Sequence, residues 1–265
     1  MKKILTLLLG IMIILSLAGC KKQAEPEPVV EPEPEPEPTA DVVTYEEYKA
    51  LPTDGSAVVT IEAYVQGVQS YWDGGATFYL QDKDGGYLAY AAKIVEEDYT
   101  KIVSNDFSEG WVGLANGMKV RVEGTKSEWS GEEEIVDGVV TLVDDGDKWI
   151  AEAVDVTNYM ATDATVNYMN QRVKFTDLTV AAYNDAGDAF SYSWDGSGTP
   201  GDDLYFNCEK DGLVYSFVVE SSLCFDGSPA YEAVEALEVG QTVDIEGFLY
   251  WYNGAQPHVV SLTVK

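Results

Sequence analysis

The chain has 265 residues, with 46 acidic against 16 basic side chains, a formal net charge of −30, a single histidine and 3 cysteines. One histidine cannot build a metal site of several histidines or a relay between histidines, so the sequence offers little for the commonest transition-metal and acid–base sites. The negative charge argues against nucleic acid as a partner, because most of the surface would repel phosphate.

The N-terminus has the pattern of an export signal. Lys2 and Lys3 precede an apolar run from Ile4 to Leu17, and small residues lead up to Cys20. The run is about 15 residues, shorter than the roughly 20 that a helix needs to cross a bilayer, so a cleaved signal fits better than a permanent transmembrane anchor. Residues 1–19 are therefore expected to form a signal peptide.

Cys20 and the residues after it are expected to form a lipid anchor and a tether. The segment from Leu17 to Cys20 resembles the lipobox of bacterial lipoproteins. That resemblance implies that Cys20 is acylated and holds the chain on the extracytoplasmic face of the cell membrane. Residues 20–43 then form a disordered spacer, because alternating Glu and Pro between Glu25 and Pro38 remove backbone donors and repel one another.

The next part of the chain predicts a short helix followed by β-strands. Thr44 and Glu47 form a capping box before a helix from Tyr45 to Leu51, which ends at Pro52. The spacing of apolar residues predicts strands over 58–70, 77–81, 87–92, 118–124 and 134–143, and a helix over 96–103. Five strands with a helix between the third and the fourth follow the order of an OB-fold barrel.

A second copy of this pattern follows. The segment Leu114–Gly124 recurs as Leu237–Gly247 with the same leucine, glycines, valine and glutamate. Further strands are expected over 173–183, 204–208, 213–219 and 259–264, with a helix from Ser228. A duplicated module favours two barrels over one sandwich. We therefore predict a mainly β protein with two tandem five-stranded OB-fold-like barrels, each with a short helix, over residues 44–157 and 158–265.

The whole layout resembles bacterial lipoproteins of the Gram-positive type that carry tandem OB-fold-like domains. The segments 59–81, 120–136 and 240–262 carry this resemblance. It implies a fold and a surface location, but it brings no ligand and no activity, because OB-folds host unrelated functions.

Aromatic residues occur where OB-folds bind ligands, across strands 2 and 3 and in the loops that join strands 1 to 2 and 4 to 5. These rings either stack on sugars, bases or peptide side chains, or plug the ends of the barrels. The candidates are Tyr71, Trp72, Tyr79 and Trp129 in the first module and Trp194, Tyr250, Trp251 and Tyr252 in the second.

The charge around these rings limits the class of ligand that can bind there. Both modules are acidic, so a glycan or a cationic envelope protein fits best as the ligand. The alternative functions are nucleic-acid binding and a role as the accessory subunit of a cell-envelope enzyme. We expect a non-catalytic binding or adaptor protein, since no nucleophile is marked beside His258. The one basic cluster, Lys119, Arg121 and Lys126, is expected to be a solvated face.

The remaining predictions concern cofactors and the pairing of the cysteines. No cofactor is expected; calcium alone is left open, because Asp82–Gly85 and Asp144–Asp147 place carboxylates close together without completing a calcium-binding loop. With Cys20 acylated, Cys208 and Cys224 either form a disulfide in the exported chain or are buried free thiols.

Overall fold

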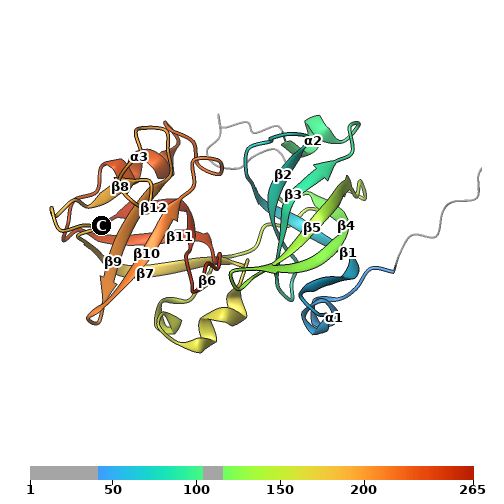
Figure 1. Ribbon diagram of the computed structural model, residues 1–265, viewed down its shortest axis with the longest axis horizontal. Coiled ribbons are helices and arrows are strands. Elements are labelled where there is room, and N and C mark those ends of the chain that lie inside the picture. The colour runs from blue at the N-terminus through green and yellow to red at the C-terminus, as the bar shows by residue number, and fades with distance from the viewer. Residues whose placement is uncertain (1–40, 104–115) are drawn as a thin grey trace, which may run out of the picture. The chain divides into compact units, whose positions relative to one another are not determined.

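Two β-barrels with the same strand order make up residues 41–103 and 116–265, the part of the chain that the computed structural model describes (Figure 1). The predicted signal peptide, Cys20 and most of the predicted spacer lie outside the described residues. Within these two ranges no helix is long and apolar enough to span a bilayer.

The first barrel is a closed sheet with the strand order β1-β2-β3-β5-β4. Neighbouring strands are antiparallel, except that β3 and β5 run parallel. A short helix, α2 (Tyr99–Val103), follows β3, where the sequence predicts one. The strands are β1 (Asp54–Val68), β2 (Gly75–Gln81), β3 (Gly86–Ile94), β4 (Lys119–Trp129) and β5 (Glu132–Leu142).

The helix α1 (Tyr45–Ala50) precedes the first barrel and begins with the predicted capping box. The Thr44 hydroxyl accepts a hydrogen bond from the Glu47 backbone N–H at 3.2 Å, and Glu47 Oε2 accepts one from the Thr44 N–H at 2.8 Å. Lys126 of β4 lies fully buried against the other end of α1, and its Nζ donates to the Tyr48 carbonyl at 2.8 Å. The prediction that Lys126 belongs to a solvated face is therefore wrong, because a helix C-terminus supplies carbonyl acceptors that replace water.

The second barrel repeats the strand order of the first. The pairings β7–β9, β9–β10, β10–β12, β12–β11 and β11–β7 return to their starting strand, and β10 and β12 are the parallel pair. The helix α3 (Pro229–Glu235) precedes β11 and is capped by the Ser228 hydroxyl. These strands are β7 (Arg172–Ala181), β9 (Leu204–Lys210), β10 (Leu213–Val219), β11 (Thr242–Phe248) and β12 (His258–Val264). The predicted pair of OB-like barrels is thus confirmed.

Short elements extend the second sheet beyond its five-stranded ring. The strand β6 (Val154–Asp155) pairs in parallel with β7, and β8 (Phe190–Tyr192) pairs with β9. Two 3-10 helices, η1 (Thr157–Tyr159) and η2 (Asp163–Tyr168), lie between β6 and β7 in the sequence. The boundary predicted at 157/158 therefore falls between β6 and the first strand of the second ring.

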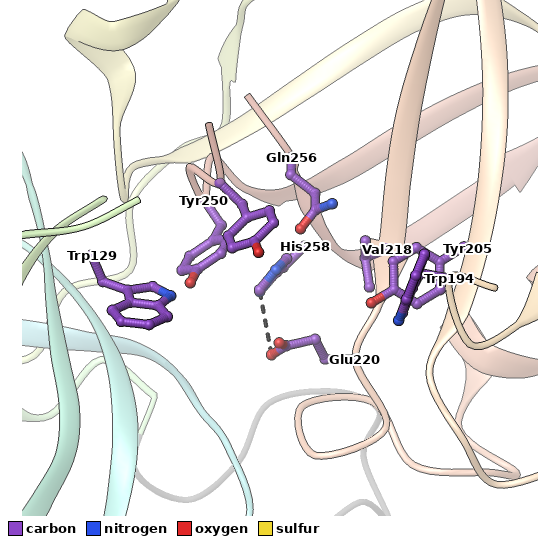
Figure 2. A pocket seen from close by; sticks show the side chains of 9 residues that line it. Trp129, Trp194, Tyr205, Val218, Glu220, Tyr250, Gln256 and His258 are labelled. Carbon is purple, nitrogen blue, oxygen red and sulfur yellow. Dashed lines mark ion pairs between the residues drawn. The ribbon is translucent and has the colours of Figure 1, made fainter. Parts of the chain in front are cut away.

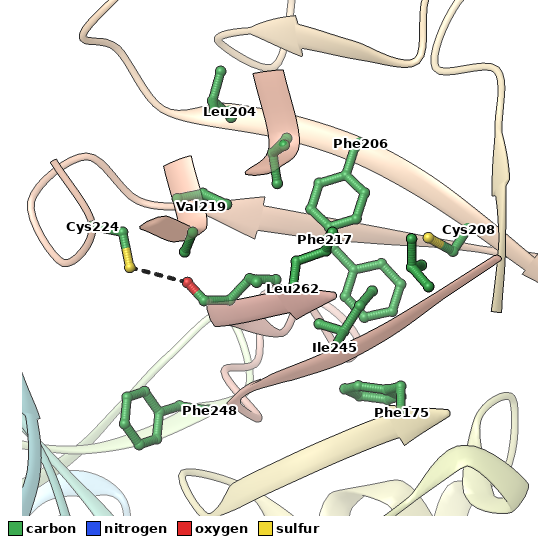
Figure 3. Close-up of a cluster of buried hydrophobic side chains, with 14 of the residues drawn as sticks. Phe175, Leu204, Phe206, Cys208, Phe217, Val219, Cys224, Ile245, Phe248 and Leu262 are labelled. Atoms are coloured by element: carbon green, nitrogen blue, oxygen red, sulfur yellow. Dashed lines mark hydrogen bonds between the residues drawn. The ribbon is translucent and has the colours of Figure 1, made fainter. Parts of the chain in front are cut away.

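Aromatic rings fill the second barrel (Figure 3). The Phe217 ring lies 5.1 Å from that of Phe175 and 5.4 Å from that of Phe206, measured between centroids. Tyr79 of the first barrel belongs to the same core, and its ring stacks on Phe248 with centroids 4.3 Å apart. Because Tyr79 is fully buried by this contact, hydrophobic burial joins the two barrels as well as filling each of them.

Cys208 and Cys224 are buried free thiols, so the structure does not contain the disulfide that the sequence left open. Figure 3 shows the two side chains at different ends of the core. The Cys224 thiol donates to the Val259 carbonyl at 3.3 Å, and burial raises the pKa of the Cys208 thiol to about 12. Both residues therefore behave as small apolar side chains.

Candidate functional site

A cavity of about 550 Å³ opens on the second barrel and is lined by four of the eight predicted aromatic residues (Figure 2). Its volume is in the range of sites that bind small organic ligands. The lining residues are Trp129, Trp194, Tyr205, Val218, Glu220, Tyr250, Tyr252, Gln256 and His258.

The floor of the cavity is set by strand pairing. Val218 of β10 pairs with Tyr205 of the antiparallel β9 on one side and with His258 of the parallel β12 on the other. Glu220 follows β10 directly, and its backbone carbonyl accepts from the N–H groups of Leu223 and Cys224 in the next turn. This is the ligand-binding region of OB-folds, across strands 2 and 3 of the barrel.

The hairpin between β11 and β12 forms one wall of the cavity. It is closed by backbone hydrogen bonds from Tyr252 N–H to the Gly254 carbonyl at 2.8 Å and from Gln256 N–H to the Tyr250 carbonyl at 2.9 Å. The Asn253 N–H donates to the Ser130 carbonyl in the β4–β5 turn at 2.7 Å. That contact between the barrels brings Trp129, the last residue of β4, to a cavity built mainly by the second barrel.

Three of the lining rings are open to solvent. The exposed fraction is 73% for Trp194, 61% for Trp129 and 51% for Tyr252. Rings that plug the end of a barrel are buried, so these three side chains do not serve as plugs. Clustered exposed aromatic surface is typical of binding sites.

A buried histidine lies at the bottom of the cavity. His258 is 2% exposed, and its Nδ1 lies 2.5 Å from the Tyr79 hydroxyl oxygen and 3.3 Å from Glu220 Oε2. The Tyr250 ring stacks on the imidazole with centroids 4.3 Å apart. Complete burial raises the pKa of Tyr79, which keeps this hydroxyl protonated. The imidazole is thus held at Nδ1 by Tyr79 and Glu220 and by the ring of Tyr250 stacked on it.

The structure brings together only some of the predicted site residues. Trp129, Trp194, Tyr250 and Tyr252 line the cavity, and Tyr79 lies beneath it as a support for His258. The sequence assigns Trp129 to a separate site in the first module, but the structure joins it to the second. Neither Tyr71 nor Trp72 lines the cavity: the Tyr71 ring contacts Tyr99 at 4.7 Å between centroids, and Trp72 is 82% exposed.

Trp251 takes part in the contact between the barrels and does not line the cavity. Its backbone N–H donates to Glu132 Oε2 of β5 at 2.8 Å, and Asn170 Nδ2 donates to Glu132 Oε1 at 2.5 Å. A side chain at Gly131 would meet the Trp251 ring, since a Cβ built there lies 2.8 Å from Cδ1. Alternation along the hairpin therefore points Tyr250 and Tyr252 toward the cavity and Trp251 toward the first barrel.

The sequence-based list of site residues lacked the polar part of the cavity, Glu220, Gln256 and His258. The only available signal was His258, as the single histidine of the chain at the start of a predicted strand. No local pattern marks Glu220, because its approach to His258 depends on the parallel pairing of β10 with β12.

Carboxylates in the described residues form no group of three or more metal-ligating side chains that could hold a metal ion. Asp82, considered for calcium, closes a turn instead. Its Oδ1 accepts from the N–H groups of Asp84 and Gly85, both at 2.8 Å, and its Oδ2 accepts from the Tyr87 hydroxyl at 2.8 Å.

Comparisons with known proteins give distant structural likenesses. No protein-family model matches the chain, and no curated protein matches it. A murine DNA-binding protein bound to double-stranded DNA is 9% identical over 77% of this chain and 94% of that one, with a TM-score of 0.34. The HINa domain of Ifi202 with a 20-base-pair DNA is 11% identical over 79% and 98%, with a TM-score of 0.31.

Asparaginyl-tRNA synthetase from Pyrococcus horikoshii, solved with asparaginyl-adenylate, matches at 17% identity and a TM-score of 0.26 over 36% of this chain. The match spans 19% of the synthetase. Two of the three structures are complexes with double-stranded DNA, which contradicts the prediction that argued against nucleic acid as a partner. Nucleic acid therefore remains among the ligands to be tested.

Proposed function

We propose that this chain is a lipid-anchored binding protein on the extracytoplasmic face of the membrane, whose aromatic cavity takes a saccharide without converting it. The observation that carries the proposal is the group of exposed rings of Trp129, Trp194 and Tyr252 around one cavity. Large exposed rings lose little conformational entropy on binding and offer flat apolar faces to the faces of sugar rings.

The polar groups of the cavity suit a ligand rich in hydroxyls. Glu220 and Gln256 supply oxygen acceptors, and the phenol groups of Tyr205 and Tyr252 both donate and accept. A site with apolar faces and a few polar groups fixes the orientation of a ligand while the rings supply most of the affinity. The proposal of saccharide binding rests on this combination.

The lining residues also support a binding role over a catalytic one. Of the nine side chains that line the cavity in the described chain, Glu220 is the only carboxylate, whereas enzymes that cleave glycosidic bonds commonly use a pair. His258 is held by Tyr79 and Glu220, and neither Ser nor Cys is among the lining residues. Incubation of a bound glycan with the protein is expected to return it unchanged.

The binding proposal predicts that Trp194→Ala and Trp129→Ala each weaken glycan affinity about tenfold or more, because each removes one stacking face. Isothermal titration of the full-length chain against a panel of oligosaccharides measures this. Trp72→Ala is the matched control, since Trp72 is even more exposed than Trp129 and Trp194 but does not line the cavity. Melting temperatures of all variants should stay close to that of the wild type.

The same titration also tests the alternative ligands. Double-stranded and single-stranded oligonucleotides test the nucleic-acid reading, and binding that falls steeply with salt would favour it. Saturable binding of an oligonucleotide with no response to any saccharide would overturn the glycan proposal. A loss of folding in both Trp129→Ala and Trp194→Ala would show that the rings are structural.

The membrane anchor is a separate part of the proposal. Cys20→Ser removes the thiol that the lipobox would acylate, and we expect the protein to move from the membrane fraction to the soluble fraction of the host. Gln23→Ser, close by in the same segment, should leave the protein in the membrane fraction. Retention of the Cys20→Ser variant with the membrane would contradict lipidation.

A further inference from the structure

Among the described residues that line the cavity, one side chain is a carboxylate, that of Glu220. Within the described residues its Oε2 accepts from Gln69 Nε2 and lies 3.3 Å from His258 Nδ1. Both contacts fall on the same oxygen, so among the described residues Oε1 is the carboxylate oxygen that is left for a ligand. Because the side chain is 23% exposed, the carboxylate is reached from the cavity and is still partly withdrawn from water.

Aromatic rings flank this carboxylate. Figure 2 shows Trp194 and Tyr205 on one side of Glu220 and Trp129 and Tyr250 on the other. The face of an aromatic ring attracts a cation, and this attraction grows when the cation is partly desolvated. A positively charged group beside Glu220 would therefore meet a carboxylate and ring faces together.

None of the nine lining residues of the described chain is Lys or Arg, and His258, which is positive only when protonated, lies beside Oε2 rather than Oε1. Negative charges act on two tyrosines that line the cavity. The pKa of the Tyr205 phenol is raised to about 12, first by burial and then by the charges of Asp203 and Glu220. Burial also raises the pKa of Tyr250, with Glu132 and Glu220 adding to the effect.

We propose that the ligand of this cavity is an amino-saccharide with a free, protonated amine, whose ammonium group is bound by Glu220 Oε1 between the ring faces. This inference rests on the proposed function and names the chemical class of its saccharide. A charge-assisted hydrogen bond from an ammonium group is about twice as strong as one from a neutral hydroxyl, so a single free amine distinguishes this class from neutral sugars.

The test compares a glucosamine tetramer with its fully N-acetylated counterpart, which has the same rings and linkages but no charged amine. Isothermal titration of the full-length chain is carried out below the pKa of the sugar amine. We expect the free-amine tetramer to bind at least about tenfold more tightly, the factor that corresponds to one charge-assisted contact.

Glu220→Gln should remove this preference, and Glu220→Asp, which keeps the charge on a shorter side chain, should retain part of it. Asp185→Asn is the control, because Asp185 is an exposed acid outside the cavity and should leave the preference unchanged. Melting temperatures of the variants separate loss of recognition from loss of folding, and the Glu220→Asp variant keeps the test informative where Glu220→Gln is unstable.

The outcomes separate this inference from the function on which it rests. Equal binding of the two tetramers by the wild type would overturn the amine preference and leave saccharide binding intact. Binding of neither tetramer nor any other saccharide would refute both. A preference that survives unchanged in a folded Glu220→Gln variant would show that the amine is recognised elsewhere.

Discussion

Replacing Lys126 by methionine is expected to lower the free energy of unfolding by about 3–5 kcal/mol, the range measured when one partner of a buried ion pair is removed. Lys126 is fully buried, and its Nζ lies 3.0 Å from Glu133 Oε2. Methionine fills nearly the same volume but supplies neither the charge nor a donor. Glu133 Oε2, a buried oxygen, would lose the ammonium group that it contacts.

The same substitution would also release the C-terminal end of α1. Lys126 Nζ donates to the carbonyl groups of Tyr48 at 2.8 Å and Leu51 at 3.2 Å, and it lies 4.5 Å from the centroid of the Tyr48 ring. The Tyr48 carbonyl also accepts from the Leu51 N–H at 3.2 Å and would keep that bond, but the Leu51 carbonyl would lose the Lys126 donor. Amide hydrogens of α1 should therefore exchange faster in the variant.

Thermal unfolding with hydrogen exchange measures both effects, and a fall in Tm of about 10 °C is expected for a domain of this size. Lys101→Met is the matched control. Lys101 is 55% exposed and lies 3.9 Å from Asp98, and surface pairs of this kind contribute about 0–1 kcal/mol. A wild-type Tm in Lys126→Met would contradict the importance of the buried amine.

The barrels could be predicted from the sequence because alternation of apolar and polar residues fixes which face of a strand is buried. β7, for example, alternates buried and more exposed positions along most of its length. Strand ends were predicted less well. β4 was expected to end at Gly124 but runs to Trp129, because residues such as Lys126 pair with β1 and β5 in a polar region that has no hydrophobic pattern.

The cavity could be predicted only in part, for a similar reason. Aromatic residues in the expected loops identified Trp194, Tyr250 and Tyr252, since the OB-like topology fixes where those loops lie. The inclusion of Trp129 depends on the contact between the barrels, in which the Asn253 N–H donates to the Ser130 carbonyl. Contacts of this kind join residues far apart in the sequence and leave no periodic signal.

That contact between the barrels contains a carboxyl group with an unusual environment. Glu132 is fully buried, and burial raises its pKa to about 8, with Glu134 and Glu133 adding to the shift while hydrogen bonds from Asn170 and Trp251 oppose it. A protonated Glu132 has an O–H group to donate. Glu132 already contacts the Asn170 side chain through Nδ2. The other polar atom of that side chain, Oδ1, is a buried acceptor without a hydrogen-bond partner in the described residues.

The stability of the protein is therefore expected to fall as the pH rises from about 5 to about 8. In the unfolded chain Glu132 titrates near 4.5, so between these two pKa values the folded state holds a proton that the unfolded state has lost. The free energy of unfolding then decreases by up to about 1.4 kcal/mol per pH unit for this one group. Burial also raises the pKa of Glu134, which adds to the same slope.

Glu132→Gln is expected to flatten this slope and to make the protein more stable than the wild type at pH 8, because glutamine keeps an acceptor oxygen and carries no charge. Denaturant unfolding at a series of pH values measures the difference. Glu128→Gln, an exposed change on the same hairpin, should keep the wild-type slope. A Glu132→Gln variant with an unchanged slope would mean that Glu132 remains ionised in the folded protein, with Asn170 and Trp251 as sufficient donors.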